Sequence, residues 1–170
     1  MKRRCLMLIS ALGIVMPAYA KSASHQERSI EAGRMVFSWS HSDDRLVVEL
    51  TAPAPGWLAV GFNAETTLIG TRFVMAAVVP EGEIRAEEHL AVPGGHADIT
   101  ELGGVFGVAD LGGKIVEGMS EVSFSLPHRA DDANAVTLVA GTPVYLMLAW
   151  AHEPEFGHHS AWRRHFEVTL

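Results

Sequence analysis

The chain has 170 residues, of which 48% are hydrophobic and 19% are charged, and its formal net charge is −7 at pH 7. This length suits one ordinary domain, and the acidic balance argues against a nucleic-acid partner, which would need a basic face. The only cysteine is Cys5, so the rest of the chain has neither a disulfide nor thiolate chemistry. The domain must therefore be held together by its apolar core.

Residues 1–20 have the pattern of an export signal. Three basic residues at positions 2–4 precede an apolar run over 6–15, and small residues lead up to Ala20. The run is shorter than the about 20 residues of a transmembrane helix, although an uncleaved anchor is the alternative. We predict cleavage after Ala20, a periplasmic or secreted protein, and no membrane span in the mature chain. Loss of the three basic residues would lower the net charge from −7 to −10.

Residues 21–32 are expected to form a polar lead-in, and the domain is expected over 33–170. From Gly33 onward, short apolar alternations separated by turns indicate strands. The expected strands cover 35–39, 45–50, 57–62, 73–79, 83–90, 105–108, 114–117, 120–126, 144–151 and 165–170. No long segment has a 3.6-residue apolar period. The pattern predicts an all-β protein, an antiparallel β-sandwich of about nine strands with an immunoglobulin-like layout.

Four of the nine histidines fall within fourteen residues that follow the most apolar expected strand. They are His152, His158, His159 and His165. Imidazole is the commonest metal ligand in proteins, but the spacing is not that of a zinc motif. A divalent-metal site, a haem ligand and a solvated polar loop all remain possible at this point.

Haem binding would require a flat apolar slot with one or two axial ligands such as His or Met. The apolar strands around the histidine segment carry the candidate lining side chains. These candidates are Trp57, Phe73, Met75, Tyr145, Met147 and Trp150. The alternative for each is ordinary core packing. Catalysis is not expected, because the chain has no G-x-S-x-G elbow and no cysteine nucleophile, and its acidic pairs do not converge on one bond.

Four stretches together resemble the DOMON domain family. They are Trp39 ahead of Asp44-Arg45-Leu46, the G-W-L-A-V-G-F run over 56–62, the E-V-S-F-S-L-P run over 121–127, and L-A-W-A over 148–151 followed by His159 and R-R-H-F over 163–166. The resemblance covers roughly residues 33–170. It implies a β-sandwich that works outside the cytoplasm and binds haem or sugars.

The resemblance also implies the positions of iron ligands. The family's C-terminal histidine corresponds to His159, with His158 as the neighbouring alternative. The family's loop methionine corresponds to Leu68, which cannot ligate iron, and Arg72 stands where the family commonly has Asp. A second ligand would then be another residue, such as Met75, or the iron would be five-coordinate.

The function that follows is an exported module that binds haem b and serves electron transfer or redox sensing. Its expected partner is a membrane cytochrome or another periplasmic redox protein. The alternative is a haem-free DOMON module that binds a sugar or a protein partner.

Overall fold

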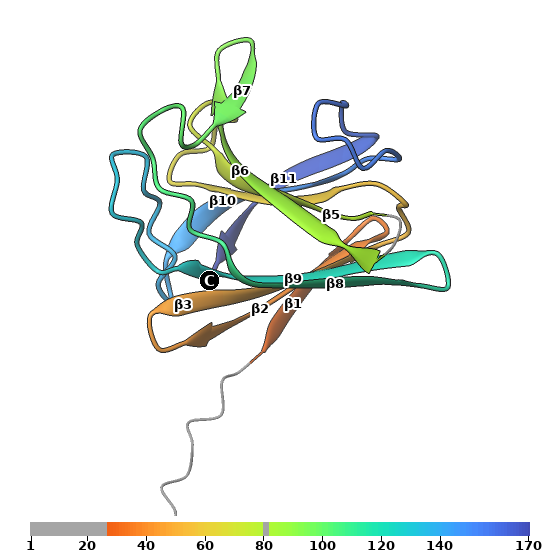
Figure 1. Cartoon of the computed structure of the whole chain (residues 1–170). Coiled ribbons are helices and arrows are strands. Elements are labelled where there is room, and N and C mark those ends of the chain that lie inside the picture. Colours follow the sequence, from red (N-terminus) through yellow and green to blue (C-terminus); the bar gives the residue numbers. More distant parts are fainter. Residues whose placement is uncertain (1–26, 80–81) are drawn as a thin grey trace, which may run out of the picture.

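The computed structural model describes residues 27–79 and 82–170, so the expected export signal lies outside the described residues. Within them the chain forms eleven strands in two antiparallel sheets, which confirms the predicted β-sandwich (Figure 1). The first sheet has the order β1 (Arg28–Ala32), β2 (Met35–Ser42), β3 (Arg45–Ala52), β9 (Met119–Pro127) and β8 (Ala109–Val116). The second has the order β11 (Trp162–Thr169), β10 (Pro143–Trp150), β4 (Leu58–Asn63), β5 (Arg72–Val78), β6 (Ile84–Val92) and β7 (Gly95–Asp98). None of the described residues belongs to a helix with the length and hydrophobicity that a membrane span requires.

The sandwich begins earlier than expected, because β1 lies inside the segment expected as a polar lead-in. β1 pairs with β2 as an antiparallel edge strand, across a turn in which Gly33 has a φ of 63°. An edge strand with one solvated face needs few apolar residues. Ile30 and Ala32 supply them by packing against the core, while the rest of the strand is polar. Residues 28–32 therefore belong to the folded domain.

The expected strand over 105–108 is not a strand, and β8 begins only at Ala109. The reason lies in the backbone hydrogen bonds of this segment. The N–H of Val105 donates to Asp132 Oδ2 at 3.0 Å, and the N–H of Gly107 donates to Glu88 Oε2 at 2.7 Å. These backbone N–H groups therefore donate to carboxylates, and not to the backbone carbonyls of a neighbouring strand.

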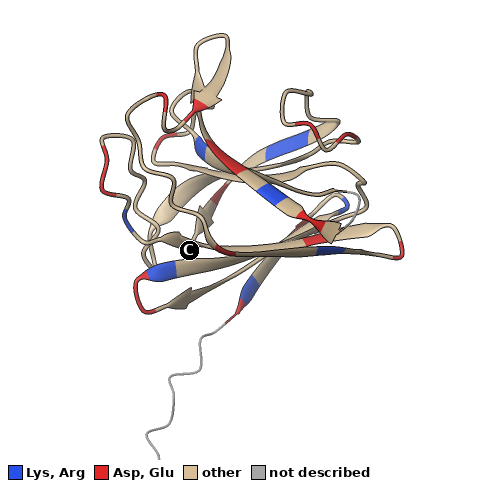
Figure 2. Ribbon diagram, viewed as in Figure 1, with Lys and Arg blue, Asp and Glu red and all other residues tan. Residues whose placement is uncertain are grey.

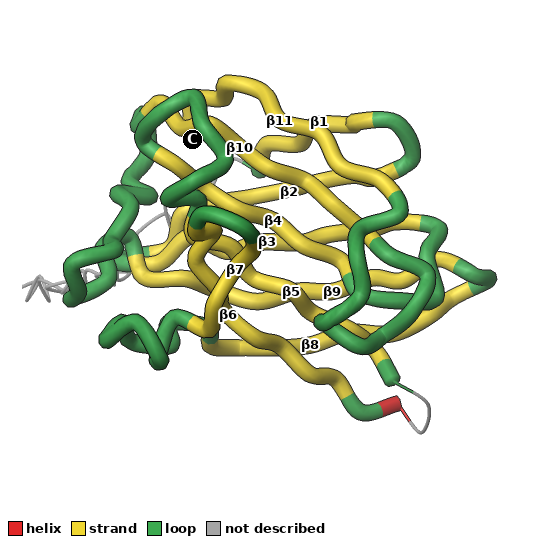
Figure 3. Tube along the Cα trace, turned by 90° about the horizontal axis from the view of Figure 1, so that it is seen from above, coloured by secondary structure: helices red, strands yellow, loops and turns green. Residues whose placement is uncertain are grey.

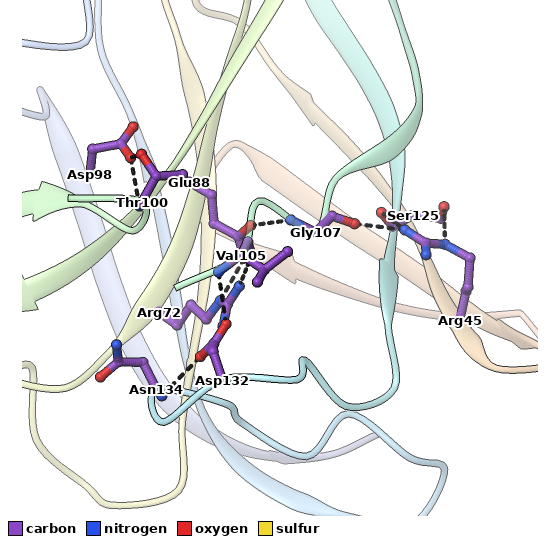
Figure 4. A network of polar contacts seen from close by, with 10 residues as sticks. All are labelled: Arg45, Arg72, Glu88, Asp98, Thr100, Val105, Gly107, Ser125, Asp132 and Asn134. Carbon is purple, nitrogen blue, oxygen red and sulfur yellow. Dashed lines mark hydrogen bonds and ion pairs between the residues drawn. The ribbon is translucent and has the colours of Figure 1, made fainter. Parts of the chain in front are cut away.

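Buried charges fix these loops to the sheets (Figure 4). Arg72 Nε lies 2.6 Å from Glu88 Oε1, and Arg72 Nη1 lies 2.8 Å from Asp132 Oδ2. A third guanidinium nitrogen, Nη2, donates to the carbonyl of Val105 at 2.7 Å. Arg72 is therefore the centre of an ion-pair network that joins β5, β6 and two loops. This network gives Arg72 a structural role.

The main core lies between the two sheets and follows the expected alternation. Phe37, Leu46, Val60, Phe124 and Leu148 are examples, each at most 1% exposed. β4 and β5 are unusual because every one of their residues is buried. Their second face belongs to a separate apolar cluster on the outer side of the six-stranded sheet. Something other than the opposite sheet therefore covers this outer face.

Candidate functional site: an apolar pocket on the outer face of the sheet

Strand alternation places large and small apolar side chains next to one another on the outer face of β4, β5 and β10. In the registers of these strands, Ala59 lies opposite both Met75 and Ala149. All three are at most 2% exposed. Because alanine projects only a methyl group, the two alanines leave a hollow between bulkier neighbours. The local sequence therefore builds a depression in the middle of an apolar sheet face.

Loops turn this depression into a pocket of about 620 Å³. Residues 68–69 come from the β4–β5 loop, residues 92 and 94–96 from the β6–β7 hairpin, and residues 157–160 from the segment between β10 and β11. Figure 1 shows the hairpin and the last segment rising above the same sheet, and Figure 3 looks down on that sheet. The volume lies within the roughly 300–1,000 Å³ of typical small-molecule sites.

Four of the six side chains predicted to bind a cofactor line this pocket. They are Trp57, Phe73, Met75 and Met147. Each is at most 7% exposed, and all belong to the outer-face cluster. The structure thus brings together residues from β5, β10 and the segment just before β4.

The other two predicted lining residues lie elsewhere. Trp150 packs against the core between the sheets, because along β10 it shares the face of Leu148 rather than that of Met147. Tyr145 does lie on the outer face, but it stacks on His165 with ring centroids 5.5 Å apart and does not line the pocket. Alternation along β10 separates Trp150 from Met147, so one pocket on the outer face cannot include both side chains.

His158 and His159 both line the pocket, at its exposed mouth. His158 Nδ1 lies 3.7 Å from Glu153 Oε2. The two other histidines of the cluster lie apart. The rings of His152 and Trp150 meet edge to face with their centroids 5.2 Å apart. The ring of His165 stacks on that of Tyr145.

The possible divalent-metal site of four histidines is not assembled. Across residues 27–79 and 82–170, no three His, Cys, Asp or Glu side chains come together in a way that would hold a metal ion. Burial and the nearby charge of Arg163 hold the pKa of His165 below its usual value. The ring of His165 is therefore mainly neutral at pH 7.

His96 lines the pocket although sequence reasoning did not select it. The β6–β7 hairpin pairs His96 with Ala91, so the two side chains share the outer face. The edge of the His96 ring meets Phe73 with centroids 5.5 Å apart. The signal was available in Pro93-Gly94-Gly95, a turn that would have folded the following residue back beside Ala91.

Arg163, on β11, brings a positive charge to the lining of the pocket. Its guanidinium can donate hydrogen bonds to a ligand. Trp57 Nε1 also has no hydrogen-bond partner among the described residues, but this atom is buried. The site can therefore hold a largely apolar ligand that also carries acceptor groups near Arg163.

No protein-family profile matches the sequence, and no curated protein matches it. The fold and the site define the protein as an antiparallel β-sandwich with an apolar pocket outside the sheet and imidazoles at the mouth of that pocket. Within residues 56–62, Trp57 and Ala59 face the pocket, whereas Leu58, Val60 and Phe62 belong to the core between the sheets.

Proposed function

We propose that the protein is an exported DOMON-like module that binds haem b and serves electron transfer or redox sensing. One observation carries this proposal: an apolar pocket of about 620 Å³ gathers aromatic, thioether and imidazole side chains from distant parts of the chain. A haem site needs a flat apolar slot with His or Met ligands nearby. The apolar lining and the His and Met side chains of the pocket support this proposal.

The residues present fit this group. His159 would supply a nitrogen ligand, with His158 as its neighbour and alternative, and Met75 would offer a thioether on the floor. Haem also carries two carboxylates, which suit the guanidinium of Arg163. When bound, haem supplies one-electron redox chemistry.

The protein itself would bury the haem from water and would leave the mouth of the pocket open to a partner protein. The floor formed by Ala59, Phe73 and Met147 excludes water from one side of the pocket, and low exposure to solvent is one determinant of a haem's reduction potential. At the mouth, Leu68 is 38% exposed and Ile69 is 53% exposed. Apolar side chains at such an edge suit a docking protein, such as a membrane cytochrome or another periplasmic redox protein.

The second candidate is a haem-free module that binds a sugar or a protein partner. The observation in its favour is Leu68, which stands where the family's ligand methionine is expected and which projects at the mouth with Ile69. In this case the pocket would receive an apolar part of the partner. The same experiment separates the two candidates.

The test is haem titration of the mature protein followed by visible spectroscopy. We expect a Soret band with saturable uptake of one haem per chain. His159→Ala, or His158→Ala if that residue is the ligand, should shift the band and weaken binding by at least tenfold. His152→Ala is the matched control, because His152 belongs to the same cluster but contacts Trp150 instead of the pocket.

A colourless protein that takes up no haem would refute the proposal and leave the second candidate. Uptake with equal affinity in all three histidine variants would mean that haem binds without these ligands. In that case the assignment of the axial nitrogen would be withdrawn.

A further inference from the structure

Three ionisable side chains on the outer face of β6 and β7 form a hydrogen-bonded chain. His96 Nδ1 lies 3.0 Å from His89 Nδ1, and His89 Nε2 lies 2.9 Å from Glu87 Oε2. The chain starts at the pocket, which His96 lines, and ends at the 48% exposed side chain of Glu87. His89, between them, is only 8% exposed. Figure 2 shows acidic positions along β6 and at the base of β7.

The carboxylate at the end of this chain decides which ring nitrogens carry hydrogen. An ionised Glu87 can only accept, so Nε2 of His89 must donate to it. In a neutral His89 the other nitrogen, Nδ1, then has a free lone pair and accepts from Nδ1–H of His96. In a neutral His96 the remaining nitrogen, Nε2, is left with its lone pair.

The surroundings hold both rings in place. Phe73 stacks on His89 with centroids 5.7 Å apart and meets His96 edge-on. Asp98 lies opposite His89 in the strand register, but its Oδ1 accepts from the N–H of Thr100 at 2.7 Å and also from the Thr100 hydroxyl. That oxygen of Asp98 is therefore already engaged.

His96 and His159 both line the pocket, although they come from β7 and from the β10–β11 segment.

We propose that Nε2 of His96 is a second nitrogen ligand for the metal of the group bound in this pocket. Metal-binding histidines are typically held by a hydrogen bond from their other ring nitrogen, often in a chain that ends on a carboxylate. The arrangement of His96, His89 and Glu87 has this form. This inference rests on the function proposed above. His96 would take the place of the methionine ligand that is absent because residue 68 is leucine.

Ligation by two imidazoles has a measurable consequence. Ligation by one methionine and one histidine gives a haem a higher reduction potential than ligation by two histidines. The wild-type protein with haem should therefore have a lower reduction potential than its His96→Met variant. Met75 is the competing ligand, and it lies on the floor at 2% exposure.

The first test uses the protein without haem. Long-range ¹⁵N–¹H NMR of the imidazoles at mildly alkaline pH should show His96 protonated on Nδ1 and unprotonated on Nε2. Glu87→Gln, whose amide can also donate, should reduce this preference, whereas Glu83→Gln, at an exposed position outside the chain, should not. A His96 ring protonated on Nε2 in the wild type would overturn the proposal.

The second test loads the wild type, His96→Ala, His96→Met and His152→Ala with haem. We expect His96→Ala to lose the low-spin spectrum of a six-coordinate iron, His96→Met to raise the potential, and His152→Ala to change neither. A loaded His96→Ala protein with an unchanged spectrum refutes the ligand role alone. A wild type that takes up no haem refutes the proposed function and this role with it.

Discussion

The buried carboxylate of Asp132 provides the sharpest test of how the loops beside the sheet are held. Its oxygens accept from Arg72 Nη1 at 2.8 and 3.0 Å, from the N–H of Val105 at 3.0 Å and from the N–H of Asn134 at 2.9 Å. Asp132→Asn keeps one oxygen but places an amide NH₂ against these donors. The change therefore removes a charge partner without changing the shape of the side chain.

The expected cost follows from what the variant retains. Breaking a buried ion pair by removing one partner costs about 3–5 kcal/mol, but Arg72 keeps Glu88 and asparagine keeps one acceptor. We therefore expect Asp132→Asn to lower the free energy of unfolding by about 2–4 kcal/mol. For a domain of this size the midpoint of thermal unfolding should fall by roughly 4–16 °C.

The assay is urea unfolding followed by tryptophan fluorescence, with thermal unfolding followed by circular dichroism. Asp131→Asn is the control, because it makes the same chemical change one residue away at an exposed position. Surface changes of this kind stay within about 0.5 kcal/mol. If the two variants had the same stability, the network would not hold the loops and the reasoning would fail.

Three further predictions concern the network and the pocket. The Val105 and Asn134 N–H groups and the Arg72 guanidinium outweigh burial and lower the pKa of Asp132, so its stabilisation is complete above the unfolded-state value of about 3.9 and is lost as pH falls through the lower folded-state value. Acid unfolding curves of the wild type should show this loss of stability, and those of Asp132→Asn should not. The same dependence of the free energy of unfolding on pH in both proteins would contradict this prediction. Ala149→Phe should fill the pocket floor and abolish haem uptake in a spectroscopic titration while the protein stays folded, and undiminished uptake would place the ligand elsewhere. A Cβ at Gly61 would lie 2.7 Å from Phe73 Cβ, so Gly61→Ala should cost about 1–3 kcal/mol in urea unfolding, and a neutral effect would mean that the strand relaxes freely.

The sequence predicted the strands because alternation is a local property. Trp57, Phe73 and Met147 were selected for their apolar surroundings, and the structure places all three at one pocket. The same alternation puts Trp150 on the face of Leu148, between the sheets, so Trp150 could not line a pocket together with Met147. The strand β1 was not predicted, because the composition of a solvated edge strand resembles that of a polar linker.

The all-β class, the apolar faces of the central strands and the histidine segment after β10 can all be recognised in the amino-acid sequence. The meeting of residues that are distant in the chain depends on the folded structure. Arg72 finds Asp132 sixty residues later in the chain, and the β6–β7 hairpin brings His96 to the mouth where His159 lies. The physical reason is that side-chain period is set within a few residues, whereas the order of strands in a sheet and the path of its loops depend on the packing of the whole chain.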